Sequence, residues 1–291
     1  MAPVTVFGLI LGSVAVVTLS SANPGSTPTH KKPTTASAPS KPVVKARVVT
    51  VTGKDFKFDA PDEIPAGLTE FRFLNKGPSI HHMQLLKLTN GKTYSDLITA
   101  LKIQGPPPRW IKEVGGPNAP APGMESNATL MLEPGNYAII CFVDIGGAPH
   151  FTKGMVRPLK VVPASGPAAV RPTPDVIVTL VDYAFNFSGP LRAGARTIKV
   201  QNSGPQSHEV ELVQLAPGKT AQDFLAWAGS GMKGPPPAKP IGGIAAVQRG
   251  MSESFSANFT PGNYAFICFV PDAKDGRPHF AHGMTKDFSV K

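Results

Sequence analysis

Two sets of four potential metal ligands recur along this chain of 291 residues. In chain order each set reads His, Cys, His, Met, and the sets are His81, Cys141, His150 and Met155, and His208, Cys268, His279 and Met284. A thiolate, two imidazoles and a weak thioether form a trigonal copper site with a long axial ligand, because soft sulfur and imidazole suit both Cu(I) and Cu(II). Structural zinc prefers four strong Cys or His ligands, so methionine makes zinc the poorer choice. Each set is a candidate copper site.

The chain contains only two cysteines, one in each set. They stand at equivalent positions of a repeat, so a disulfide within one copy is impossible and a bridge between two equivalent strands is not expected. A lone cysteine is most often a small buried hydrophobic residue. That interpretation leaves the histidines and methionines at similar spacing in both copies unexplained.

An internal repeat organises the chain. The segment from Asn75 to Cys141 returns 127 residues later, and the block PHFTKGM returns 129 residues later as PHFAHGM, so the second copy has two extra residues in one loop. The repeat predicts two homologous domains, over residues 47–162 and 175–291, joined by a Pro/Ala/Gly-rich linker over residues 163–174.

Short runs rich in β-branched and aromatic residues, bounded by Gly, Pro and Asn, are typical of strands. In the first copy these runs are ARVVTVT, LTEFRFL, HHMQLLKL, ATLML, NYAIICFV and PLKVV. In NYAIICFV a period of two places Tyr137, Ile139 and Cys141 on one face, at the end of a strand that runs into a loop. Six or more short strands in about 115 residues predict an antiparallel β-sandwich.

One short helix is expected in each copy. Thr93 with Asp96, and Thr220 with Asp223, form sequences typical of a capping box, and apolar residues follow each of them. With 29 glycines and 32 prolines in the chain, long helices are not expected.

The N-terminal region is predicted to target or anchor the protein. Residues 3–19 are uncharged and mostly apolar, at the lower limit of the ~17 to 25 residues of a membrane span and longer than the ~7 to 15 of a signal-peptide core. We expect residues 1–22 to be a signal anchor, helical over 3–21, with a cleaved signal peptide as the alternative. Residues 23–46, rich in Pro, Ser, Thr and Lys, are expected to be an extended tether.

The net charge of +10 does not indicate nucleic-acid binding. Residues 1–47 contain five Lys or Arg and no acidic residue, whereas residues 48–162 have 12 basic against 10 acidic residues and residues 175–291 have 11 against 9. The predicted domains are nearly neutral, so DNA or RNA is not an expected partner. A basic segment next to an apolar one suits an anionic membrane surface better.

At these motifs the sequence resembles the cupredoxin, or type 1 blue copper, family. In that family a Greek-key β-sandwich binds one copper through an upstream His and a C-terminal Cys, His, Met loop. The loop CFVDIGGAPHFTKGM is also similar to the ligand loop in the type 1 copper domain of copper nitrite reductases. The resemblance implies an all-β chain of two tandem cupredoxin-like sandwiches, each with a short inserted helix and one copper. Many cupredoxins have Asn after the first His ligand, where this chain has His82 and Glu209.

The histidines are too few for an enzymatic copper cluster. Of seven, four belong to the two sets and His30 lies in the tether, which leaves His82 and His282, both expected to be exposed or to support the ligands. The cysteines are flanked by Ile and Phe rather than by histidines, so a trinuclear cluster cannot be built, and a type 2 copper site like that of nitrite reductases needs three further histidines. No orienting Asp or Asn indicates a nucleophilic Cys–His pair. We therefore predict that the protein is not an enzyme.

The sequence as a whole predicts a membrane-tethered, periplasmic or otherwise extracytoplasmic carrier. It would pass single electrons between redox protein partners through two copper sites, without a small-molecule substrate. The alternative is a copper-free accessory subunit of a membrane complex, respiratory or photosynthetic. Lys31 and Lys32 follow the apolar segment and argue against export by the positive-inside rule, but the copper ligands, the tether and the resemblance favour it.

Overall fold

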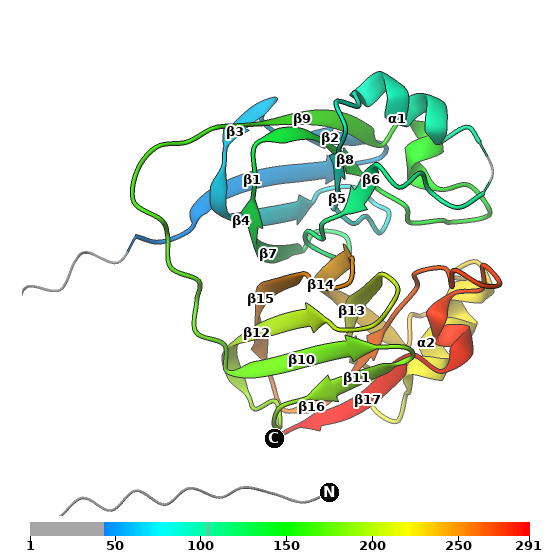
Figure 1. Ribbon diagram of the computed structural model, residues 1–291. Helices are drawn as coiled ribbons and strands as arrows, with labels where there is room; N and C mark the ends of the chain where they lie inside the picture. Colours follow the sequence, from blue (N-terminus) through cyan, green and yellow to red (C-terminus); the bar gives the residue numbers. More distant parts are fainter. Residues whose placement is uncertain (1–43, 104) are drawn as a thin grey trace, which may run out of the picture. The chain divides into compact units, whose positions relative to one another are not determined.

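A computed structural model describes residues 44–103 and 105–291. The helix predicted over 3–21 and the tether up to residue 43 lie outside this range. Within it, no helix has the length and apolar character needed to cross a membrane. Strands dominate and the two α-helices are short, which confirms the all-β expectation (Figure 1).

The described chain has two halves of similar order, which we call the first half (residues 47–162) and the second half (residues 175–291). The elements of the first half are β1 (Arg47–Lys54), β2 (Lys57–Asp59), β3 (Glu63–Pro65), β4 (Gly67–Asn75), β5 (Gln84–Leu88), α1 (Tyr94–Ala100), β6 (Ile111–Glu113), β7 (Glu125–Leu132), β8 (Gly135–Ile140), the 3-10 helix η1 (His150–Lys153) and β9 (Val156–Val162). Those of the second half are β10 (Val176–Val181), β11 (Ala184–Phe187), β12 (Gly194–Asn202), β13 (His208–Leu215), α2 (Ala221–Gly229), β14 (Ala238–Val247), β15 (Ser252–Phe259), β16 (Gly262–Ile267), the 3-10 helix η2 (His279–His282) and β17 (Thr285–Val290).

Each half is a β-sandwich. One sheet belongs to a single half, with strand order β3-β9-β8-β5-β6 in the first and β14-β13-β16-β17 in the second. The other strands of both halves form one eight-stranded sheet of order β11-β10-β12-β15-β7-β4-β1-β2. The two sheets of the first half enclose a common core, in which Phe71 of β4 and Ile139 of β8 are fully buried.

The predicted alternation along β8 is confirmed. Tyr137, Ile139 and Cys141 belong to the core between the sheets, whereas Ala138 and Ile140 belong to a separate apolar cluster that includes residues of α1. The helix thus covers the outer face of this strand, so that the strand carrying Cys141 is buried on both sides.

Both helices begin with the predicted capping box. Asp96 N donates to Thr93 Oγ1, and Thr93 N donates to the Asp96 carboxylate at 2.9 Å; Thr220 and Asp223 make the same pair of bonds. Thr93→Ala should lower the free energy of unfolding by about 1 kcal/mol, because it leaves an N-terminal N–H of the helix without its acceptor. Urea unfolding measures the loss, and an unchanged midpoint would contradict the prediction.

The strand predicted to begin at His81 begins at Gln84, which corrects the sequence-based expectation. The neighbouring strand β6 is short, and its last pair joins Glu113 to Leu86. In the second half β14 is longer and pairs as far as His208, so β13 does begin at its histidine.

Main-chain pairing also joins the two halves. Residues 114–121 follow β6 and run beside β14, where Gly115 N donates to Ala246 O and Ala245 N donates to Gly116 O, both at 2.9 Å. The described residues accordingly belong to one compact unit.

Each of these two segments has a glycine packed tightly against a backbone carbonyl of its own half. Gly116 has a φ of +119°, and a Cβ there would lie 2.3 Å from Met83 O. Gly243 in β14 has a φ of +118°, and its Cβ would lie 2.0 Å from Val210 O. Since any side chain would collide with backbone atoms, only glycine fits at either position.

Candidate metal centre

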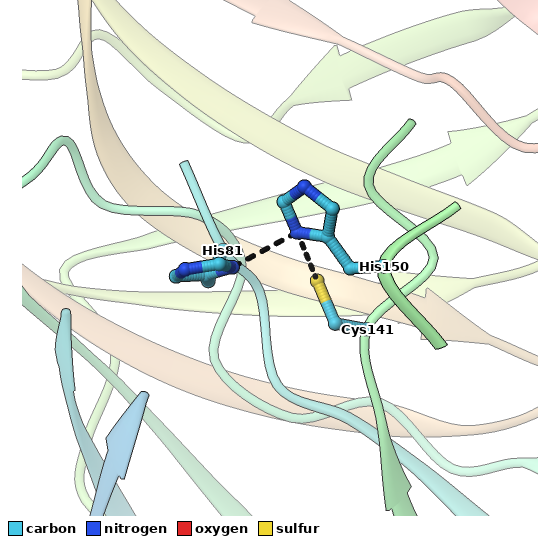
Figure 2. A group of neighbouring side chains, drawn as sticks. All are labelled: His81, Cys141 and His150. Atoms are coloured by element: carbon cyan, nitrogen blue, oxygen red, sulfur yellow. Dashed lines mark hydrogen bonds between the residues drawn. The ribbon is translucent and has the colours of Figure 1, made fainter. Parts of the chain in front are cut away.

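Three predicted ligands of the first half converge in a group that we call the first site: His81, Cys141 and His150. Their ligand atoms all lie within 4.8 Å of one another, and all three residues are buried. His150 Nδ1 lies 2.9 Å from His81 Nδ1 and 3.6 Å from Cys141 Sγ (Figure 2). The loop after β4 supplies His81, the end of β8 supplies Cys141, and η1 begins with His150.

His208, Cys268 and His279 form the same arrangement in the second half, the second site. His279 Nδ1 lies 3.0 Å from His208 Nδ1 and 3.4 Å from Cys268 Sγ. The two extra residues lie in the loop between Cys268 and His279, and they leave the positions of the donors similar to those of the first site.

The backbone of each methionine is hydrogen-bonded to the second histidine and the cysteine of its own site. Met155 is fully buried; its N–H donates to His150 O at 3.1 Å, and its carbonyl accepts from Cys141 N at 3.1 Å. Met284 makes the corresponding bonds to His279 and Cys268. The backbone therefore fixes each methionine to the other ligands of its loop, and its role as axial ligand stays a prediction.

A carboxylate orients the first histidine of each site. His81 Nε2 lies 2.5 Å from Asp55 Oδ1, and His208 Nε2 lies 2.6 Å from Asp182 Oδ1. A carboxylate accepts hydrogen bonds, so each ring donates from Nε2. Its Nδ1 therefore carries a lone pair that faces the other candidate metal ligands. Metal-bound histidines are commonly oriented in this way.

The sequence analysis did not identify these two aspartates. A signal existed, because Asp55 and Asp182 are 127 residues apart and each precedes an aromatic residue. Each lies 26 residues before its histidine. Parallel pairing of β1 with β4, which sets Gly53 opposite Asn75, brings the ends of these strands together and with them Asp55 and His81.

The residue after the first histidine supports the cysteine loop in both sites. His82 Nε2 accepts from Phe142 N at 2.8 Å, and Glu209 Oε1 accepts from Phe269 N at 2.8 Å. Both side chains are buried, and burial lowers the pKa of His82 to about 4 and raises the pKa of Glu209 to about 7. His82 is therefore one of the supporting side chains that the sequence analysis expected.

His282 also supports a site. Its ring stacks on Tyr183 with centroids 5.0 Å apart, and Tyr183 packs edge-on against His279 at 5.3 Å. Its Nε2 lies 3.2 Å from Asp275 Oδ1. Among the described residues, Asp272, Asp275 and His282 form a third group of possible metal ligands, but Asp272 is already bonded to Tyr183 and Gln206.

Burial keeps the donors of the first site uncharged in the metal-free chain. It raises the pKa of Cys141 to about 12, while burial and the neighbouring His81 lower the pKa of His150 to about 4. A metal ion would supply the missing positive charge, because a coordinating thiol loses its proton. The backbone N–H groups of His82 and Val143 act in the opposite direction to burial and lower the pKa of this thiol.

The donor set fits copper. Two neutral imidazoles and one thiol converge, and each first histidine is fixed by a carboxylate. Soft sulfur with imidazole favours copper over hard cations. The two buried groups could therefore each hold one copper ion, as the resemblance to type 1 copper sites implies.

No family model and no curated protein matches this chain. Among solved structures it is similar to dithionite-reduced auracyanin from the photosynthetic bacterium Roseiflexus castenholzii, with 22% identity, coverage of 40% of this chain and 94% of that one, and a TM-score of 0.28. It is also similar to the blue copper oxidase from Nitrosomonas europaea (16% identity, 85% and 86% coverage, TM-score 0.27) and to a copper-containing nitrite reductase from Thermus scotoductus (12% identity, 86% and 62% coverage, TM-score 0.23). These identities and TM-scores are low, so the function proposed for this protein is derived from the geometry of its two sites.

Proposed function

We propose that this protein binds one copper ion in each site and carries single electrons between protein partners. One observation carries the proposal: in both halves two imidazole Nδ1 atoms and one sulfur converge in a buried group. Bound copper would supply a one-electron couple between Cu(I) and Cu(II). The chain's own part is to hold the donors in one geometry for both oxidation states, so that little rearrangement accompanies the transfer.

Burial favours electron transfer over catalysis. His81 and Cys141 are 0% exposed and His150 is 1% exposed, which leaves no side of the first site open to a substrate. Of the other histidines in the described ranges, His82 and His282 are engaged in supporting the sites. These facts support a pair of mononuclear sites over a cluster that activates a substrate.

We also propose that the protein works outside the cytoplasm, attached to the membrane by residues 3–21, with soluble or membrane-bound redox proteins as partners. The support is the apolar segment and the long tether that follows it in the sequence. The intact mass of the protein purified from its membranes tests the anchor. A mass corresponding to an N-terminus near Asn23 would show that the segment is removed.

Copper stoichiometry and the visible spectrum test the function. Two copper ions per chain and an intense thiolate-to-copper band are expected after reconstitution of the wild type. Cys141→Ser and Cys268→Ser should each retain one copper ion and part of the band, and the double variant should have no band, because serine lacks the soft thiolate. Well-folded protein without copper would contradict the proposal and favour the copper-free accessory subunit.

A further inference from the structure

Asn118, a buried side chain at the junction of the two halves, touches the surroundings of both sites. It is 2% exposed and lies in the segment that runs beside β14. Its Nδ2 donates to Glu209 Oε2 at 3.3 Å, and Met83 N, next to His82, donates at 3.0 Å to the carbonyl oxygen of Pro117, the residue before Asn118. Asn118 thus reaches Glu209 through its side chain and His82 through the backbone of Pro117 and Met83.

The neighbours of Asn118 fix the direction of these bonds. Ala119 N donates to Asn118 Oδ1 at 2.9 Å, and Asn118 Nδ2 also donates to Val210 O at 3.2 Å, so the amide oxygen and nitrogen are distinguished. His82 accepts at Nε2 from Phe142 N. Glu209 accepts at both carboxylate oxygens.

An unbroken chain of covalent and hydrogen bonds therefore joins the two cysteines. From Cys141 it follows the backbone to Phe142 N, crosses to the His82 ring, continues along the backbone to Met83 N and crosses to Pro117 O, whose residue precedes Asn118. From the Asn118 side chain it crosses to Glu209 and then to Phe269 N, and Phe269 follows Cys268. Contiguous networks of this kind couple distant sites more strongly than an unbonded gap does.

We propose that an electron passes within one molecule between the two sites along this chain through Asn118. The inference rests on the proposed function. With copper bound at both sites, the step would oxidise Cu(I) to Cu(II) at one site and reduce Cu(II) to Cu(I) at the other; one electron would move, no bond would break and no proton would leave. A one-electron redox protein supplies the electron at one site, and another accepts it at the other.

Glu209→Gln breaks the connection with almost no change in shape. Both carboxylate oxygens of Glu209 accept a hydrogen bond, whereas glutamine has a single oxygen and cannot serve Phe269 N and Asn118 Nδ2 together. The rate of electron exchange between the sites should fall about tenfold. Glu253→Gln is the matched control, because Glu253 is a buried glutamate at the same junction that binds Gly116 N and is not a link of the chain; its rate should equal that of the wild type.

The measurement uses the full chain loaded with two copper ions and reduced by one electron in a fast pulse. Spectra of Cys141→Ser and Cys268→Ser identify the band of each site, so the electron can be followed from one band to the other. A wild-type rate of electron exchange in Glu209→Gln would overturn the inference, and so would a rate that rises in proportion to protein concentration. In either case, a chain that still binds two copper ions would leave the proposed function standing. A chain without copper would overturn both.

Hydrogen exchange of the metal-free chain provides a second readout. Asn118→Leu lies in neither cysteine loop, yet it should speed exchange of the Phe269 amide by about fivefold, because Glu209 loses a bond that positions it. Exchange of the Phe142 amide should stay unchanged, because the bond from Met83 N to Pro117 O does not use the Asn118 side chain. Unchanged exchange at the Phe269 amide in a folded variant would show that Asn118 does not hold the second loop.

Discussion

Replacing Gly77 by alanine is expected to weaken copper binding at the first site by about 10- to 100-fold, the usual effect of losing the partner that orients a metal ligand. A Cβ at Gly77 would lie 2.6 Å from Asp55 Oδ1 and 2.7 Å from His81 Nε2, the two atoms of the hydrogen bond that orients the histidine. Alanine must therefore push them apart, and His81 would lose its fixed orientation.

The equivalent substitution can be made at the second site. A Cβ at Gly204 would lie 2.7 Å from His208 Nε2 and 3.1 Å from Asp182 Oδ1, so Gly204→Ala should weaken the second site and leave the first unchanged. Gly189→Ala is the control, because its Cβ would meet no atom within 4 Å. Competition with a Cu(I) chelator measures both affinities in each variant. Wild-type affinity at the first site of Gly77→Ala would contradict the role given to Asp55.

Glu253→Gln should make the metal-free protein more stable at neutral and higher pH. Glu253 is 1% exposed; its Oε2 accepts from Gly116 N at 3.2 Å, and its Oε1 has no hydrogen-bond partner. Burial raises the pKa of this carboxyl well above its ordinary value of 4.5, although the positive charge of Arg171 opposes the shift. The folded chain therefore keeps a proton that the unfolded chain releases.

The sign of the pH dependence follows from that proton. Below pH 4.5 the carboxyl is neutral in both states and contributes no difference. As the pH rises, only the unfolded chain ionises, so the free energy of unfolding falls by about 1.4 kcal/mol per pH unit up to the raised pKa. Glutamine does not titrate, so Glu253→Gln should remove this part of the slope. Glu211 is also buried, and one of its oxygens has no hydrogen-bond partner among the described residues. Its pKa is raised well above 4.5, so it makes the free energy of unfolding fall with pH in the wild type and in Glu253→Gln alike.

Urea unfolding between pH 4.5 and 8 measures the effect. The stability difference between Glu253→Gln and the wild type should grow steadily with pH. Glu63→Gln, a substitution of an exposed glutamate, serves as the control and should leave the slope unchanged. Parallel pH profiles for Glu253→Gln and the wild type would show that the carboxyl ionises in the folded chain as readily as in the unfolded one.

Features that depend on short spacing could be predicted from the amino-acid sequence. The period of two along β8 predicted that Cys141 faces the core with Tyr137, and the capping boxes at Thr93 and Thr220 predicted where both helices begin. The repeat also paired the two His, Cys, His sets, and the structure brings the three residues of each set together. Local backbone preferences and strand alternation suffice for the strand face and the helix starts, because the residues involved lie close together in the chain. His81 and His208 lie far from their cysteines in the sequence, and the repeat and the resemblance assigned them to their sets.

The residues that surround these ligands come from distant parts of the sequence, and strand pairing brings them there. Asp55 meets His81 because β1 and β4 pair in parallel, and β5 begins at Gln84 instead of His81 because β6 is short. Asn118 meets Glu209, 91 residues away, since the segment after β6 pairs with β14 of the other half. No local period encodes such contacts, because they depend on how two complete sandwiches pack.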